Sequence, residues 1–103
     1  MEKWENQKTR DLYKAILALK TAGEARRFLR DLLTEDELME LGNRWLAARL
    51  LAEKETYKAI QEKTGLSERT IARIAKWLKQ GMGGYKLMIN RFNHHNSSDF
   101  KKG

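Results

Sequence analysis

Residues 56–74 read TYKAIQEKTGLSERTIARI, two short helical segments that are joined at Gly65. Thr56 and Ser67 are of the residue types that cap helix N-termini, and each stands at the start of one segment. Gly65 lies where the first helix must end in a left-handed turn, a conformation that glycine adopts without strain. The stretch therefore predicts a helix-turn-helix unit over about residues 56–79.

The apolar residues of this stretch have the spacing that two packed helices need. Ile60 is the inner residue of the first helix, and Leu66 is expected to pack beneath the turn. Ile71 and Ile74 are the inner residues of the second helix, and Leu78 follows one turn later. The remaining surface of the second helix is polar and mainly basic.

That polar surface suits the major groove of DNA. Arginine can bond guanine through two acceptors at once, and hydroxyl groups can reach bases or phosphates. We predict base or nearby phosphate contacts from Arg69, Thr70 and Arg73. We predict contacts with the DNA backbone from Lys58, Ser67, Lys76 and Lys79. Glu68 shares this surface and leaves two alternatives open, because its carboxylate could accept a bond from a cytosine amino group or could cap the helix and stay away from DNA.

The net charge of +7 is concentrated in the same part of the chain. Residues 34–55 carry three basic and six acidic side chains, whereas residues 56–80 carry six basic and two acidic ones. A localised basic face attracts the phosphate backbone of nucleic acid, because each neutralised phosphate releases counterions. A solvated helical surface without any partner is the alternative interpretation of the charge alone.

Composition limits the class of protein. The chain has 103 residues, a length that favours one domain, and it is 41% hydrophobic and 34% charged, which argues against overall disorder. No apolar run approaches the roughly 18 residues of a membrane span, and the N-terminus has no apolar signal core. We therefore expect a cytoplasmic protein with no membrane partner. The absence of cysteine excludes disulfides and thiolate metal ligands.

Apolar residues recur at helical spacing along the whole chain, which predicts an all-α fold. A first helix carries an apolar stripe that ends at Leu17, and the patterns Thr21–Glu24 and Thr34–Glu37 are capping boxes that predict the starts of the next two helices. Glycines at positions 81, 83 and 84 predict the end of a further helix and a flexible joint. A last helix is expected to end near Phe92, which gives a domain over residues 1–92 and a disordered tail over residues 93–103.

The third predicted helix contains the sequence LMELGNRWLAARLL at residues 38–51, which is apolar on more than one face. We expect it to be central and buried, either by its own chain or by a partner. Close approach of another helix would explain Gly42, and a tolerated glycine is the alternative. Apolar faces too wide for one small bundle predict a homodimer. The tryptophans at positions 4, 45 and 77 are expected in a core.

Two segments outside the turn resemble a known family. Residues 29–45, LRDLLTEDELMELGNRW, resemble the part of the tryptophan repressor family that leads into its DNA-reading head. Residues 77–91, WLKQGMGGYKLMINR, resemble the YerC/YecD branch of TrpR-like bacterial proteins, and the similarity covers about residues 8–92. The resemblance implies an interlocked all-α homodimer with about six helices per subunit. It also implies that two heads project residues 67–79 into successive major grooves of a near-palindromic site in double-stranded DNA.

The resemblance further implies a ligand pocket. Arg44 and Arg73 occupy the positions of the two arginines that sandwich the indole in tryptophan-binding members, and Thr34 also matches. Ile74 and Trp77, however, fall where those members have glycine and serine, and Trp77 is large enough to fill the slot itself. We therefore expect no cofactor, and in particular no tryptophan co-repressor, while any other small-molecule effector stays unknown.

No pattern in the chain indicates an enzyme. The acidic run at residues 35–37 stands in a helix-capping position, and no histidine or serine partner is evident for acid–base or nucleophilic chemistry. The pair His94–His95 lies in a polar tail and is a poor metal site without further ligands, so we expect no metal.

The sequence therefore predicts a bacterial sequence-specific DNA-binding regulator of transcription, most simply a repressor that occupies its operator as a dimer. One alternative is a helical protein-interaction module with the same dimeric fold, and Gln61 and Glu68 are the residues that favour it. The other alternative is a repressor gated by an unidentified small ligand.

Overall fold

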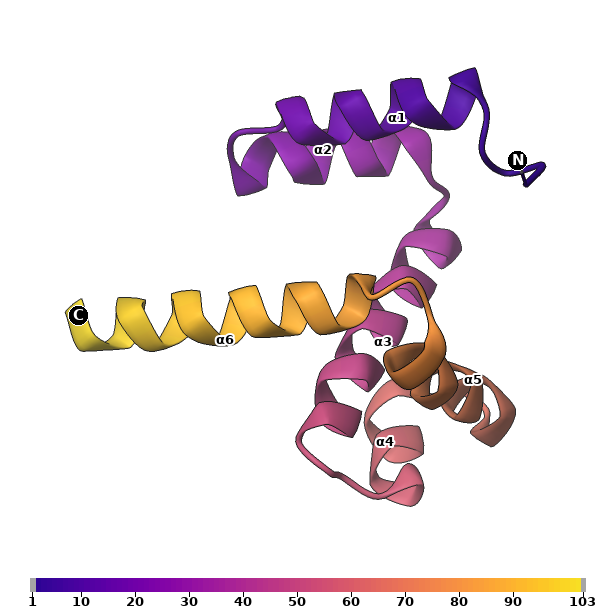
Figure 1. The fold of residues 1–103 in the computed structure, drawn as a ribbon, viewed down its shortest axis with the longest axis vertical. Helices are drawn as coiled ribbons and strands as arrows, with labels where there is room; N and C mark the ends of the chain where they lie inside the picture. Colours follow the sequence, from indigo (N-terminus) through magenta and orange to yellow (C-terminus); the bar gives the residue numbers. More distant parts are fainter. Residues whose placement is uncertain (1, 103) are drawn as a thin grey trace. The chain divides into compact units, whose positions relative to one another are not determined.

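The computed structural model describes the backbone of residues 2–102 and the side chains of residues 2–93. Within that part of the chain there are six helices and no strand: α1 (Gln7–Ala18), α2 (Ala22–Leu32), α3 (Glu35–Ala52), α4 (Tyr57–Thr64), α5 (Glu68–Gln80) and α6 (Gly84–Lys102) (Figure 1). The predicted all-α fold is confirmed. The chain divides into two compact units, Met1–Leu38 and Met39–Gly103.

The first unit begins with a helix cap that the sequence patterns did not predict. Asn6 Oδ1 accepts a hydrogen bond from the backbone N–H of Thr9 at 3.1 Å, and Thr9 Oγ1 accepts from the backbone N–H of Asn6 at 3.0 Å. This reciprocal arrangement is a capping box with threonine in the place of the usual glutamate or glutamine. It starts α1 after Trp4, which lies outside the helix and is 47% exposed rather than buried.

The two predicted capping boxes differ in how completely they form. Thr34 Oγ1 accepts from the N–H of Glu37 at 3.1 Å, and Glu37 Oε1 accepts from the N–H of Thr34 at 2.9 Å, so this box is complete. Thr21 likewise caps α2, but the Glu24 carboxylate accepts from the N–H of Lys20 at 2.9 Å instead of from Thr21. The Glu24 carboxylate thus accepts a hydrogen bond from Lys20, the residue before the N-cap Thr21.

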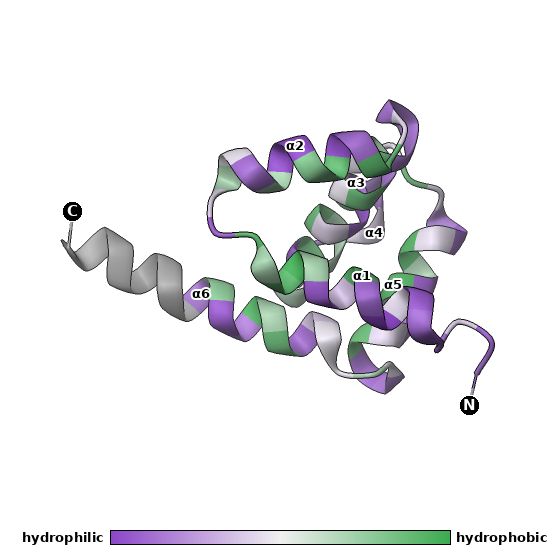
Figure 2. Cartoon of the chain, turned by 90° about the horizontal axis from the view of Figure 1, so that it is seen from above, coloured by the Kyte–Doolittle hydropathy of each residue, from purple (hydrophilic) through white to green (hydrophobic). Residues whose placement is uncertain are grey.

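Neither α1 nor α2 contains a buried residue. The two helices run in opposite directions (Figure 1), and apolar and polar residues succeed one another along each of them (Figure 2). Tyr13, Ile16, Leu17 and Leu32 are large apolar side chains of these helices that stay exposed. The first unit therefore has apolar faces that its own helices do not cover.

The second unit contains the buried core of the described side chains. Its buried apolar members come from four helices: Ala47, Ala48, Leu50, Ile60, Ile71, Ile74 and Ile89. The alanines stand on α3 and belong to one buried cluster with the isoleucines of α4, α5 and α6. The C-terminal half of α3 therefore contributes Ala47, Ala48 and Leu50 to the buried core, while its role as the central helix stays a prediction.

The N-terminal part of α3 in this unit is not covered. Met39 and Leu41 are exposed, and a Cβ added at Gly42 would meet nothing within 4 Å. The close helix approach that could explain Gly42 is therefore not present within the described residues of the chain.

Helix α6 is attached to α3 by an aromatic and cationic cluster. The rings of Trp45 and Phe92 meet edge to face, with centroids 6.2 Å apart and an interplanar angle of 90°. The Arg49 guanidinium carbon lies 5.6 Å from the Trp45 ring centroid and 5.5 Å from that of Phe92. Such cation–π contacts are stabilising, so Arg49 connects the two rings electrostatically as well as sterically.

The joint between α5 and α6 depends on glycine. Gly83 has a φ of +85°, and a Cβ at Gly81 would lie 2.5 Å from the carbonyl oxygen of Trp77. The backbone of α6 continues as a helix through Lys102, beyond the end near Phe92 that the periodicity predicts. Side chains from residue 94 onward lie outside the described residues, and the disordered tail over residues 93–103 stays a prediction.

Across the described residues, none of the helices combines the length and the apolar character needed to cross a bilayer.

The hydrogen bond from Thr34 generates a prediction about pH. The backbone and hydroxyl of Thr34 hold the pKa of the Glu37 carboxyl below its ordinary value of 4.5. A carboxyl whose pKa is lower in the folded than in the unfolded state stabilises the folded state when the pH is above the unfolded-state pKa. This stabilisation is lost as the pH falls through the folded-state pKa. We expect Glu37→Gln to lower the free energy of unfolding at neutral pH, and we expect that difference from the wild type to disappear in acid, as measured by urea unfolding across this range.

Asp36→Asn is the matched control, because it removes a carboxylate from the same helical turn without breaking a hydrogen bond that fixes the cap. It should change the free energy of unfolding less than Glu37→Gln does. A Glu37→Gln effect of equal size at neutral and acid pH would contradict the role of the ionised carboxylate.

Candidate nucleic-acid interface

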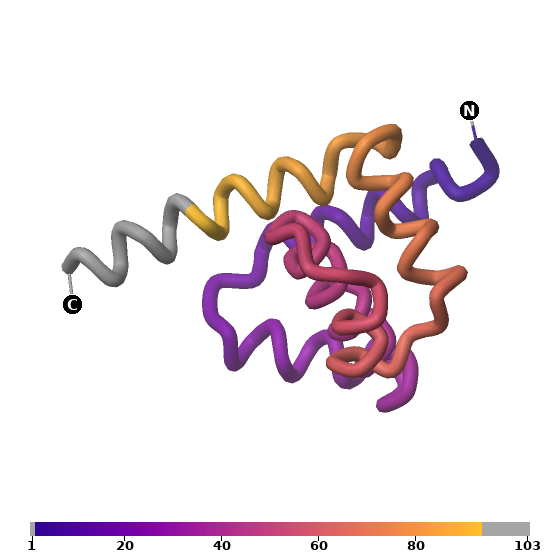
Figure 3. Tube along the Cα trace, turned by 90° about the horizontal axis from the view of Figure 1, so that it is seen from below, coloured from indigo at the N-terminus to yellow at the C-terminus, as the bar shows by residue number. Residues whose placement is uncertain are grey.

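The chain turns at Gly65 between α4 and α5, as the colour scale of the Cα trace in Figure 3 lets the reader follow. Hydrogen bonds hold this turn on both sides of Gly65. Gly65 has a φ of +74°, and its N–H donates to the carbonyl oxygen of Gln61 at 2.8 Å. The buried hydroxyl of Thr64 donates to the Ile60 carbonyl at 2.7 Å and accepts from the Leu66 N–H at 3.1 Å. The predicted left-handed turn is confirmed, and Thr64 is a further turn residue that the sequence analysis did not identify.

The inner positions of the helix-turn-helix unit are those that the sequence predicts. Ile60, Ile71 and Ile74 have no exposed surface, and Leu66 and Leu78 pack against the same core. Because two inner residues of α5 are fixed in this way, the rotation of α5 about its own axis is fixed as well. The opposite side of α5 is therefore held toward the solvent.

That outward side of α5 carries mainly hydrogen-bond donors. Arg69, Arg73 and Lys76 follow one another at spacings of four and three residues, so they share one face of the helix. The exposed side chains of α5 beyond Glu68 are Arg69, Ala72, Arg73, Lys76, Trp77, Lys79 and Gln80. Within the described residues, the cations of this set form no ion pair. Their charges are thus available to an external anion.

Two of the predicted contact residues take part in the cap of α5. Ser67 Oγ accepts from the backbone N–H of Thr70 at 3.1 Å and donates to Thr70 Oγ1 at 3.0 Å. Ser67 is exposed, whereas Thr70 is half-buried. The hydrogen of the Thr70 hydroxyl remains available to an external acceptor.

Helix α4 contributes one unpaired cation near its start. Lys58 is exposed and forms no ion pair within the described part of the chain. Lys63 at the other end of α4 is engaged, because its Nζ lies 3.1 Å from Glu55 Oε1. Lys58, the predicted backbone contact on α4, is thus free of such an ion pair, and its contact with DNA stays a prediction.

Glu68 is the first residue of α5 and the only acidic one in its first turn. It is exposed, and its carboxylate makes no hydrogen bond or ion pair among the described residues. The capping role belongs to Ser67. The structure thus shows no capping hydrogen bond from Glu68, while its contact with a cytosine stays a prediction.

The three residues of the predicted ligand pocket have separate surroundings. Thr34 belongs to the first unit, where it caps α3. Arg44 belongs to the second unit and pairs with Glu40 through an Nη2–Oε2 distance of 2.9 Å, while its Nε is buried without a hydrogen-bond partner. Arg73 is exposed on the outward side of α5.

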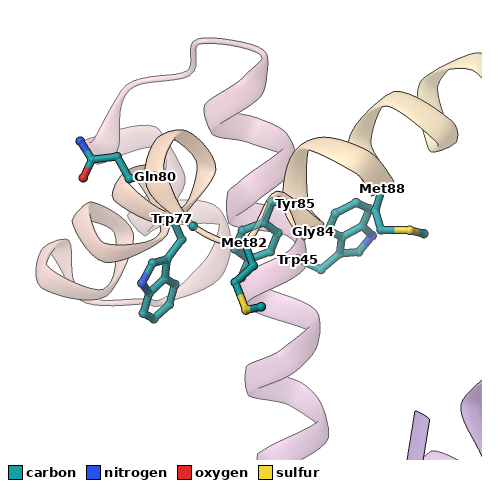
Figure 4. A pocket seen from close by; sticks show the side chains of 8 residues that line it. Trp45, Trp77, Gln80, Met82, Gly84, Tyr85 and Met88 are labelled. Atoms are coloured by element: carbon teal, nitrogen blue, oxygen red, sulfur yellow. The ribbon is translucent and has the colours of Figure 1, made fainter. Parts of the chain in front are cut away.

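The second unit has an apolar pocket of about 780 Å³ that does not include these residues. Its walls come from α3, the end of α5, the following loop and the start of α6: Trp45, Trp77, Gln80, Gly81, Met82, Gly84, Tyr85 and Met88. Trp77 and Met82 extend in a common direction, away from the side chain of Gln80 (Figure 4). Burial raises the pKa of the Tyr85 phenol above its ordinary value of 10.0.

The two large residues that the resemblance places in a tryptophan slot, Ile74 and Trp77, have different surroundings. Ile74 is fully buried in the core, and Trp77 is 42% exposed at the pocket wall. Trp77 is therefore not a core residue as predicted. Sequence reasoning identified the large side chain at this position, but it did not identify Tyr85 and Met88 as its neighbours across the pocket.

The described residues contain no cluster of three or more potential ligands that could hold a metal ion. The side chains of His94 and His95 lie outside the described part of the chain. The carboxylates at residues 35–37 stand in the first turn of α3, where they interact favourably with the positive end of the helix.

Comparison with known proteins agrees with this geometry. Residues 7–93 match the sequence profile of the family described as Trp repressor protein. The chain is 35% identical over 91 residues to the uncharacterised protein YerC of Bacillus subtilis strain 168, with 88% of each chain covered.

Two crystal structures show the same fold. A TrpR-like protein from Eubacterium eligens ATCC 27750 superposes with a TM-score of 0.84 at 38% identity, covering 88% of this chain and 94% of that one. A candidate Trp repressor from Staphylococcus aureus superposes with a TM-score of 0.83 at 31% identity, covering 88% of this chain and 91% of that one.

A helix-turn-helix unit whose second helix buries its apolar face and exposes a basic one is typical of helix-turn-helix DNA-binding regulators. Within that class, the chain belongs to the Trp repressor family. The resemblance to this family and to YerC that the sequence indicates is confirmed. The family consists of regulators and is not an enzyme family.

The positive φ at Gly65 generates a prediction about stability. Gly65→Ala would place a side chain in the left-handed region, which costs about 1–2 kcal/mol, so we expect the free energy of unfolding to fall by that amount. Gly84→Ala is the control, because its added Cβ meets nothing within 4 Å and no positive φ is required there. Equal effects of the two substitutions in chemical unfolding would show that the turn is not constrained at Gly65.

Proposed function

We propose that this protein is a sequence-specific transcriptional repressor that binds a near-palindromic operator in double-stranded DNA as a homodimer. The observation that carries the proposal is the division of α5 into two sides. Ile71 and Ile74 are fully buried, whereas Arg69, Arg73 and Lys76 are exposed on the other side without ion-pair partners in the described chain. A helix fixed in this way can enter a major groove with its donors toward the bases.

The proposed contacts divide into two kinds. Arg69, Thr70 and Arg73 are proposed to reach base edges or nearby phosphates, because arginine can bond the two acceptors of guanine and the Thr70 hydroxyl retains a free hydrogen. The remaining residues are proposed to contact phosphates and to set the position of the head: Lys58, Ser67, Lys76 and Lys79. Such phosphate contacts carry affinity, while base contacts carry specificity.

Uncovered apolar surface supports the homodimer. Helices α1 and α2 contain no buried residue, and Leu17 is 83% exposed. In the second unit, Met39, Leu41 and Leu87 are also exposed. Exposed apolar area on this scale is unfavourable in water, and a second copy with two-fold symmetry would bury the same patches on both subunits. A dimer would also present two heads to half-sites about one helical turn apart.

We propose that the repressor works without tryptophan as co-repressor. Trp77 stands at the pocket wall where a tryptophan-binding member has serine, and Glu40 holds the Arg44 guanidinium in an ion pair. An effector that is not tryptophan remains compatible with the apolar pocket. Because bacterial DNA lies in the cytoplasm, the proposed function places the protein there.

The proposed base contact of Arg73 can be measured directly. We expect Arg73→Ala to weaken binding to a DNA fragment selected from the source genome by about 1–3 kcal/mol, the usual loss for one base contact. Fluorescence anisotropy titration at near-physiological salt measures this change. Lys86→Ala is the charge-matched control, since Lys86 is an exposed cation on α6 and should affect binding little.

Unchanged affinity of Arg73→Ala would remove Arg73 from the interface. The wild-type titration should also weaken steeply with salt, because phosphate contacts release counterions. Wild-type binding that ignores salt, or no binding at all, would contradict DNA binding and favour a helical protein-interaction module.

The predicted independence from tryptophan is tested by thermal unfolding. A ligand that binds only the folded state raises the melting temperature. At a ligand concentration of 100 times the dissociation constant, the free energy of unfolding increases by about 2.7 kcal/mol. We expect the melting temperature in millimolar L-tryptophan to equal the melting temperature in the same concentration of glycine. A dose-dependent increase specific to tryptophan would show that Trp77 does not block the site.

A further inference from the structure

The first turn of α5 contains a carboxylate that the fold itself does not use. Ser67 caps the helix through the 3.1 Å bond from the Thr70 N–H, so Glu68 is not needed for that purpose. Glu68 is exposed, and it forms no hydrogen bond or ion pair within the described residues. It is followed directly by Arg69, whose side chain is also exposed and has no ion-pair partner in that part of the chain.

The chemistry of a carboxylate limits what it can pair with in a major groove. An ionised carboxylate only accepts hydrogen bonds, so guanine and thymine, which present acceptors in the groove, are unfavourable neighbours. Adenine presents an amino donor, but the N7 acceptor beside it repels the carboxylate. Cytosine presents an amino donor alone. Cytosine is therefore the base that an exposed glutamate on this surface selects.

The side chains around Glu68 make such a contact accessible. Ala72 lies one turn beyond Glu68 and Arg69 on the exposed side of α5, and its small side chain leaves room for both to reach base edges. Arginine has only donors and pairs with the two acceptors of guanine. The positive end of α5 also lies close to Glu68 and reduces the cost of a negative charge near phosphates.

We propose that Glu68 selects a cytosine in the operator half-site, beside a guanine that Arg69 selects. This proposal rests on the proposed DNA-binding function and adds the base preference of the head. Glu68 is then a specificity residue: it discriminates between sequences, while the surrounding cations supply most of the affinity. Substitution of Glu68 should change the sequence preference of the protein more than its overall affinity for DNA.

The test is selection of bound duplexes from a random double-stranded DNA library by the full-length protein, at near-physiological salt, with sequencing. The wild type should enrich a two-fold motif that contains a cytosine next to a guanine in each half-site. Glu68→Gln keeps the size of the side chain but can also donate, so the cytosine preference should fall by roughly fivefold or more at that position. The rest of the motif should stay.

Two further variants sharpen the test. Arg69→Ala should lose the neighbouring guanine preference and keep the cytosine preference. Glu62→Gln is the charge-matched control, because Glu62 is an exposed carboxylate on α4 of the same head, and it should leave the motif unchanged. Thermal unfolding of each variant confirms that it is folded before selection.

The outcomes separate this proposal from the function on which it rests. An identical motif for wild type and Glu68→Gln would overturn the role of Glu68, even if affinity for every sequence rises. Salt-dependent wild-type binding without a base preference would overturn it too, while leaving DNA binding in place. A wild type that shows no salt-dependent affinity for DNA would overturn both.

Discussion

The packing of isoleucines from α4 and α5 against the alanines of α3 is the interaction on which the rest of the structure depends. Ile60, Ile71 and Ile74 have no exposed surface, and burial of each such side chain contributes about 1.5–3 kcal/mol relative to exposure. Ala47 and Ala48 are fully buried in the same cluster. Because these contacts fix the orientation of α5, they also determine which of its side chains stay in solvent.

The two units of the chain differ in how far a single copy can stabilise them. Met39–Gly103 contains the buried core, whereas α1 and α2 in Met1–Leu38 contribute no buried residue. The N-termini of α1 and α2 are nevertheless capped, so local hydrogen bonds define where these helices start. The apolar faces of both helices stay exposed. The proposed homodimer would cover apolar surface that these helices leave exposed.

The sequence predicted the helix-turn-helix unit well because glycine, serine and isoleucine act there through local geometry, and Gly65, Ser67 and Ile71 have the expected roles. It missed the Asn6 cap, which uses threonine instead of an acidic side chain. It also placed Trp77 in a core. Exposure of a large apolar side chain depends on which elements pack over it, and a single sequence with helical periodicity does not specify those neighbours. The same reason explains why the apolar pocket was not predicted.

The loop between α5 and α6 tolerates little change in its sequence. Gly81 N–H donates to the Trp77 carbonyl at 2.9 Å, and a Cβ added at Gly81 would collide with that carbonyl. After the loop, α6 contacts α3 through Trp45, Arg49 and Phe92. Because this loop lines the apolar pocket together with α3, α5 and α6, a side chain added at position 81 would displace one wall of that pocket.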